Sequence, residues 1–113
     1  MKVNDLIPKS TFSEIYIRVI QKQAPRRVKT KRGRQTYVNE ILVGDETGTV
    51  IFSLWGWKTG DEIHVNQCLK INDGWVSEYL GTKSVTLGRE GYFTPVPDDG
   101  TIPTASELLK TSH

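Results

Sequence analysis

Residues 42–57 read Leu-Val-Gly-Asp-Glu-Thr-Gly-Thr-Val-Ile-Phe-Ser-Leu-Trp-Gly-Trp and carry the strongest structural signal in the chain. An apolar run ends at Val43, and the next five residues, Gly-Asp-Glu-Thr-Gly, have the chemistry of a turn. Glycine supplies positive φ there, and the aspartate can bond the backbone two residues on. Residues 49–55 then alternate in polarity, which is typical of a half-buried strand. The stretch predicts a β-hairpin whose second strand points Val50, Phe52 and Leu54 inward and Trp55 outward.

The length and composition of the chain restrict its class. A chain of 113 residues has room for one domain with a single modest core and a tail. The single Cys68 excludes an internal disulfide and a cysteine-cluster metal site, and it suits a reducing compartment. No apolar run approaches the roughly 18 residues of a membrane span, and the first residues lack the apolar segment of a signal peptide. We therefore expect an intracellular protein of the cytoplasm or nucleoid, with no membrane contact.

Positive charge is concentrated in one part of the chain, although the net charge is only +2. Between Ile15 and Asn39 there are eight basic residues and no acidic one, whereas the chain from Gly44 onward is predominantly acidic. Such a run can be a solvated loop, but its density and its position between two strand patterns favour contact with a polyanion. The residues that we expect to contact phosphates in this way are Arg26, Arg27, Lys29, Lys31, Arg32 and Arg34.

Alternating patterns predict four more strands, at residues 12–22, 35–43, 67–79 and 84–88. Residues 25–34 are expected to form a basic loop, because Pro25 has no N–H to donate to a ladder. The phase of 35–43 is ambiguous, and a bulge in that strand would resolve it. Asn72-Asp73-Gly74 breaks the phase of the fourth strand in the same manner. The expected core faces include Ile15, Ile17, Val19, Leu69, Ile71, Val85 and Leu87.

Five short strands without a long helix predict an all-β fold, a small closed or nearly closed barrel, because closure removes exposed sheet edges. Residues 92–103 contain three prolines and Asp98-Asp99-Gly100, which is typical of extended or flexible chain. Glu107 follows Thr104 by three residues, a signal for the start of a short helix. We expect a barrel domain over residues 1–91 and a tail over residues 92–113, which is either disordered or docked on the barrel.

The sequence gives little support for catalysis. His64 lies in a connector and His113 is the last residue. The pairs Asp45-Glu46 and Asp61-Glu62 are adjacent on extended chain, so their carboxylates point apart and do not form an acid–base dyad. Neither a glycine-rich phosphate loop nor a metal-ligand spacing is present in the sequence. We therefore expect a protein that is not an enzyme and that uses no cofactor and no metal.

Binding has better support, because three aromatic residues fall in the outward phase of two strands. Trp75 and Tyr79 are four residues apart on one strand face, about 13 Å by strand rise. Trp55 on another strand can lie beside them, and exposed rings of this kind stack nucleobases. The alternative is that the three rings close the bottom of the barrel or pack under the tail. Trp57 follows Gly56 in a connector and is equally consistent with core packing and with ligand contact.

These residues carry a family resemblance. The run 43–50, closed by Leu54-Trp55-Gly56, resembles the single-OB-fold single-stranded DNA-binding proteins of crenarchaea and their relative, human single-stranded DNA-binding protein 1. It is similar, more distantly, to the DNA-binding OB domains of replication protein A. The resemblance extends over roughly residues 2–90, through Leu69-Lys70-Ile71-Asn72-Asp73-Gly74-Trp75, Tyr79-Leu80-Gly81 and the Thr30-Lys31-Arg32-Gly33 loop.

The resemblance implies a five-stranded OB barrel that binds single-stranded DNA in replication, recombination and repair with little sequence preference. Stacking would involve Trp55, Trp75 and Tyr79, and Lys83 would join the phosphate contacts. The tail after Asp99 is short and lacks the long glycine-rich, acid-tipped extension with which some members recruit replication and repair proteins. Two alternatives remain open: an OB subunit whose aromatic face is covered by a protein partner, and an OB module for single-stranded RNA. We expect a monomer or weak oligomer.

Overall fold

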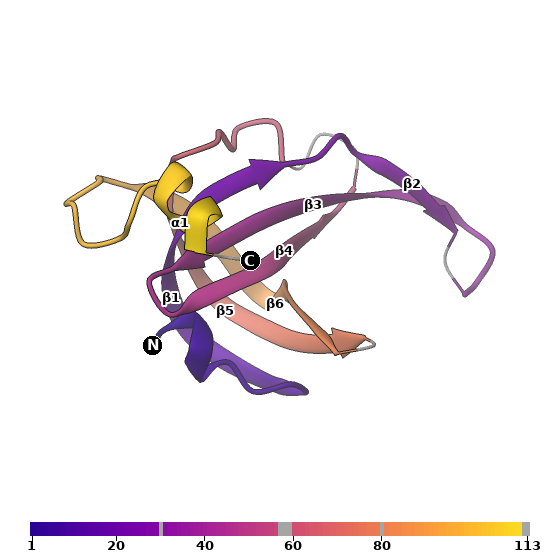
Figure 1. Cartoon of the computed structure of the whole chain (residues 1–113). Coiled ribbons are helices and arrows are strands. Elements are labelled where there is room, and N and C mark those ends of the chain that lie inside the picture. Colours follow the sequence, from indigo (N-terminus) through magenta and orange to yellow (C-terminus); the bar gives the residue numbers. More distant parts are fainter. Residues whose placement is uncertain (30, 57–59, 80, 112–113) are drawn as a thin grey trace.

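The computed structural model describes residues 1–29, 31–56, 60–79 and 81–111, and for Tyr79 and Thr111 it describes the backbone only. Figure 1 shows a curved sheet with a short helix at one end and a two-stranded arm at the other. A single 3-10 turn, Val3–Asp5, precedes the first strand. The other elements are β1 (Ser10–Lys22), β2 (Arg26–Lys29), β3 (Gln35–Asp45), β4 (Gly48–Trp55), β5 (Cys68–Tyr79), β6 (Thr82–Val96) and α1 (Ala105–Thr111).

Five of the strands close into a barrel. The order is β1-β5-β6-β4-β3, and the ring closes because β1 also pairs with β3. The β4–β6 pairing is parallel, and the other pairings are antiparallel. A closed five-stranded barrel of this kind is the OB architecture. The fold class predicted from the sequence is confirmed.

The hairpin expected at residues 42–55 is present, and its turn is tight. Asp45 pairs with Gly48 across a two-residue loop, and the Asp45 carboxylate accepts the Thr47 N–H at 2.8 Å. The same buried carboxylate also accepts the Val3 N–H at 2.9 Å. The turn therefore fixes the N-terminal segment against the end of the barrel as well as reversing the chain.

The ambiguous phase of the second predicted strand is settled by its pairing with β4. Asn39, Ile41 and Val43 lie opposite Leu54, Phe52 and Val50, so these three pairs face the interior. The bulge that we expected in this strand lies instead in β1, between Val19 and Gln21. β1 must bend there because it pairs with β5 along its first half and with β3 along its second.

The fifth predicted strand, 84–88, is much longer in the structure, because β6 continues from Thr82 to Val96 across the boundary expected at residue 91. The expected break in β5 is confirmed: the register shifts between Asn72 and Gly74, and Asp73 has a φ of 53°. Beyond this break β6 pairs again with β5, up to Cys68 opposite Val96. Pro95 lies opposite Leu69 of β5, and β6 has a ladder partner on this side only. A proline is tolerated at such an edge position because it has no N–H to donate to a second ladder.

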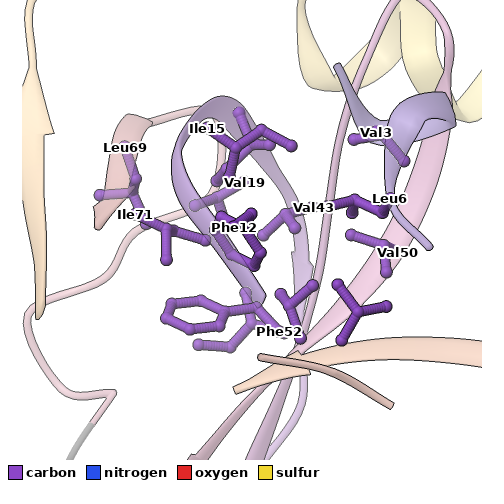
Figure 2. Packing of buried hydrophobic residues seen from close by; sticks show 14 of the residues in the cluster. Val3, Leu6, Phe12, Ile15, Val19, Val43, Val50, Phe52, Leu69 and Ile71 are labelled. Atoms are coloured by element: carbon purple, nitrogen blue, oxygen red, sulfur yellow. The ribbon is translucent and has the colours of Figure 1, made fainter. Parts of the chain in front are cut away.

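The core fills the barrel with the side chains predicted from the alternating patterns. Ile15, Ile17 and Val19 are buried, and so are the inward residues of β4. Figure 2 shows Val3 and Leu6 of the N-terminal segment beside Val43 and Val50, where they close one end of the core. Phe93 packs edge-on against Phe52 with ring centroids 5.7 Å apart, which explains why residues beyond 91 remain attached to the barrel.

The basic segment 25–34 is not only a loop. Pro25 separates β1 from the next strand, as expected, but Arg26–Lys29 forms β2 and pairs with residues 35–38 of β3. The strand is compatible with its charge because the residues opposite it, Gln35 to Val38, are uncharged. We call this two-stranded extension, residues 26–29 and 31–38, the basic arm. It projects beyond the barrel at the right of Figure 1, away from both termini.

The C-terminal segment docks on the barrel rather than extending from it. Ile102, Ala105 and Leu108 are buried, and α1 lies against β1. The predicted helix start is confirmed, because the Glu107 N–H donates to Thr104 Oγ1 and the Glu107 carboxylate accepts the Thr104 N–H. The segment is held by Arg18, which is 1% exposed although it belongs to the basic run of the sequence.

Candidate nucleic-acid interface

Trp55 is the last residue of β4 and is 56% exposed. It lies opposite Val38, at the point where the basic arm leaves the barrel. The backbone on its C-terminal side is fixed by two bonds. The Gly56 N–H donates to the Tyr37 carbonyl at 2.7 Å, and Asn39 Nδ2 donates to the Gly56 carbonyl at 3.0 Å. An exposed indole on a fixed backbone can bind a flat ligand with little loss of conformational entropy.

Trp75 lies on the same outer surface as Trp55, two strands away. It is 41% exposed and pairs with Thr86 in β6, while the next pair, Val76 with Val85, faces the core. β6 separates β5 from β4 in the sheet order, so the two indoles lie on the strands that flank β6. We call the outward side chains of these three strands, Ser53, Trp55, Trp75 and Thr86, the aromatic face.

Two aromatic residues predicted for this face are not fully described. Tyr79 ends β5, and its backbone pairs with Thr82, but its side chain lies outside the described part of the chain. Trp57 also lies outside the described residues. The stacking roles of both residues stay predictions.

The basic arm carries the exposed positive charge predicted from the sequence. Arg27 and Lys29 on β2 are exposed, as are the three basic residues of the tip, and the arm borders the Trp55 end of the aromatic face. Arg26 is different, because it forms an ion pair of 2.5 Å with Glu40 on β3. The residues at the tip are Lys31, Arg32 and Arg34.

Lys83, the seventh predicted phosphate contact, lies away from the basic arm. It is the second residue of β6, and its ammonium donates to the Leu6 carbonyl at 2.9 Å. Leu42, Ile51 and Lys83 border one hollow at the other end of the outer face. Lys83 therefore lies at the end of β4 that is away from the basic arm. Its hydrogen bond to Leu6 also holds the N-terminal segment.

The structure brings two further residues to the interface that the sequence did not indicate. Arg89 is exposed and borders a hollow of about 440 Å³ together with Thr11 and Gly74, which adjoin Trp75. Asn39 is buried and holds the chain after Trp55. Arg89 is followed directly by the acidic Glu90 in the sequence, and Asn39 depends on a partner 17 residues away, so neither produced a local signal.

The remaining chemistry-bearing groups are not arranged around this face. Cys68 is buried, and burial raises the pKa of its thiol above the ordinary value, which is consistent with an inert side chain. Within residues 1–29, 31–56, 60–79 and 81–111, no three His, Cys, Asp or Glu side chains are grouped so as to hold a metal ion. None of the helices in the described part of the chain has the length and apolar character needed to cross a membrane.

A family model described as single-stranded DNA binding protein Ssb-like, OB fold, matches residues 4–92. The chain belongs to this family. The Single-stranded DNA binding protein Ssb of Saccharolobus solfataricus is 32% identical to the chain over 107 residues, which make up 95% of this chain and 70% of that protein. These matches confirm the resemblance identified from the run 43–56 and its neighbours.

Solved structures are similar in fold. The replication factor A related protein of Methanobacterium thermoautotrophicum superposes with a TM-score of 0.70 at 18% identity, covering 85% of this chain and 89% of that one. A chain of a replication protein A heterotrimer bound to ssDNA gives a TM-score of 0.72 at 16% identity, covering 92% of this chain and 26% of that one. At these identities the likeness shows the OB fold and nothing beyond it.

Proposed function

We propose that this chain is a non-catalytic protein that binds single-stranded DNA through the aromatic face and the basic arm. One observation carries the proposal: Trp55 and Trp75 are exposed on one outer surface of three adjacent strands, next to exposed basic residues. Family membership and the printed name of the Saccharolobus relative support the same ligand. Bases would stack on the indoles and on Tyr79, and phosphates would contact the arm.

The aromatic face and the basic arm would bind different parts of the strand because their chemistry differs. Every base has a flat π-face, so stacking on tryptophan contributes about 1–3 kcal/mol per base with little dependence on sequence. Arginine and lysine of the arm neutralise phosphates, which also carry no sequence information. The protein would therefore coat and protect single strands of any sequence, as required in replication, recombination and repair. It would act where DNA is exposed, in the nucleoid.

The test is a fluorescence titration of the protein with oligo-dT and with oligo-U at two salt concentrations. Quenching of tryptophan emission by oligo-dT, with an affinity that falls as salt rises, is the expected result, because each neutralised phosphate of a single strand gives a slope of about 0.7. Stronger quenching by oligo-U would favour the RNA module. The absence of quenching by either oligonucleotide would favour a protein partner on the aromatic face and contradict the proposal.

Arg32→Ala separates the arm from the stacking surface. Arg32 is exposed at the tip of the arm and is far from the core, so the variant should fold like the wild type. We expect a salt slope lower by up to about 1 and an unchanged maximal quenching, because the indoles remain in place. An unchanged slope would show that the tip of the arm does not contact phosphates.

A further inference from the structure

The barrel contains a hollow beside Trp55 that ordinary stacking does not use. β4 and β6 pair only at Ile51 with Ser84 and at Phe52 with Val85, and their ladder ends there. Beyond this point a hollow of about 350 Å³ opens at the surface between the two strands. In the described part of the chain it is lined by Ser53, Leu54, Trp55, Thr86, Leu87 and Phe93.

From this geometry we propose that the hollow is a pocket for one nucleobase of the bound strand, inserted beside Trp55 rather than stacked on the open face. The inference rests on the proposed function, because it needs a single strand lying along the aromatic face. It adds a specific base site, with Thr86 and Ser53 as the residues that border its mouth.

The chemistry of the lining favours a nucleobase over a phosphate or a charged peptide side chain. The described lining residues are uncharged, so the pocket offers a phosphate no opposite charge. Leu87 and Phe93 are partly buried against the core and form an apolar floor. An apolar floor of this kind suits the flat face of a base. The hydroxyls of Ser53 and Thr86 can each donate to and accept from the polar edge of a base.

The position of the pocket also fits a strand that contacts the two indoles. Trp55 forms one wall of the hollow, while Thr86 forms another and pairs with Trp75 across the β5–β6 ladder. The pocket therefore lies between the two exposed rings. A strand crossing from one indole to the other must pass over it, so that one nucleotide of the bound segment is directly above its mouth.

An abasic scan tests this proposal. The shortest oligo-dT that gives full binding is prepared with a single abasic site at each position in turn, so that the strand has little freedom to shift register. For the wild type we expect lower affinity at the positions that stack on the indoles and at one further position between them, where loss of the base lowers affinity by about tenfold, in the range for removing one bound base.

Filling the pocket should remove that dependence. Thr86→Leu places a larger apolar side chain at the mouth without adding an aromatic ring. We expect its affinity for intact oligo-dT to fall about tenfold, with no further loss when the position between the stacked bases is abasic. Ser53→Leu fills the hollow from the opposite wall and should give the same result. Thr94→Leu, an exposed substitution elsewhere on β6, is the matched control and should keep the wild-type profile.

The outcomes separate this inference from the proposed function. A wild-type profile in which every sensitive position stays sensitive in Thr86→Leu and Ser53→Leu would overturn the pocket and leave the function intact. Binding with a flat abasic profile would overturn both. Folded Thr86→Leu or Ser53→Leu that binds intact oligo-dT as tightly as the wild type, or more tightly, would also overturn the pocket. Failure of the wild type to bind oligo-dT would overturn both.

Discussion

Arg18 and Asp98 lie 80 residues apart in the sequence and form a two-point ion pair, with Arg18 Nη1 and Nη2 at 2.9 and 3.0 Å from the two carboxylate oxygens. The same guanidinium donates to the carbonyls of Asn66, Ile102 and Pro103. A planar guanidinium can make all these bonds because its donors form a fixed fork. Arg18 therefore fixes the C-terminal segment to the barrel, on the side away from the basic arm.

Replacing Arg18 with methionine should release this segment. The variant keeps an apolar stem of similar length but leaves three carbonyls without their donor, and we expect a loss of about 3 kcal/mol in the free energy of unfolding. Urea unfolding measures the loss, and amide exchange of residues 102–110 shows whether α1 detaches. Affinity for oligo-dT should not change. A variant of wild-type stability would show that the segment docks without Arg18.

The same ion pair predicts how stability depends on acidity. The hydrogen bonds from Arg18 hold the pKa of the Asp98 carboxyl below its ordinary value of 3.8. A carboxyl whose pKa is lower in the folded state stabilises the protein above its unfolded pKa, and this stabilisation is lost as pH falls through the folded value. Asp98→Asn should therefore be less stable than the wild type at neutral pH.

The difference in unfolding free energy between wild type and Asp98→Asn should be constant above about pH 5 and shrink as pH falls below about 4. Urea unfolding of both proteins between pH 3 and pH 7 measures it. A difference that stays the same down to pH 3 would mean that the carboxylate charge makes no contribution through Arg18.

Glu40→Gln should strengthen DNA binding. Glu40 lies opposite Ser53 beside the aromatic face and pairs with Arg26, so the change removes a negative charge and frees a guanidinium. We expect affinity for oligo-dT to rise a few-fold at low salt and the salt slope to grow by up to about 1. Glu46→Gln is the matched control, because Glu46 forms an exposed pair of equal length with Lys2 at the far end of β4. Equal effects of both changes would indicate a general charge effect rather than a contact made by Arg26.

Gly74→Ala tests the break in β5. An added Cβ at this position would overlap the ring of the buried Phe12, so the ring or the strand must move. We expect a loss of about 1–3 kcal/mol in unfolding free energy, as for other overpacked cores. In Gly48→Ala, the control, the new Cβ would lie 3.8 Å from its nearest neighbour, and stability should be close to that of the wild type. Thermal unfolding of both variants distinguishes the two outcomes.

The sequence predicted the parts of the fold that are encoded locally. The Asp45 turn, the inward phase of Val50 and Phe52, the exposure of Trp55 and the break near Gly74 all follow from residue spacing within a few positions. These same local signals predicted an exposed Trp75, which together with Trp55 defines the aromatic face.

The parts that the sequence did not predict depend on contacts between distant segments. β2 forms because uncharged residues on β3 lie opposite its basic side chains, and β6 extends to Val96 because Phe93 reaches Phe52. Arg18 belongs to the basic run of the sequence, yet its buried guanidinium forms an ion pair with Asp98. No periodicity within a single strand distinguishes such an arginine from one that binds phosphate.

Base binding by Trp55 and Trp75 together is measured most directly by the anisotropy of labelled oligo-dT. The oligonucleotide is titrated with wild type, Trp55→Ala, Trp75→Ala and the double variant. Both side chains are largely outside the core, so all four proteins should unfold at similar temperatures. We predict a loss of about tenfold or more for each single variant and a larger loss for the double variant. Wild-type affinity in a folded double variant would show that these two indoles do not bind the bases.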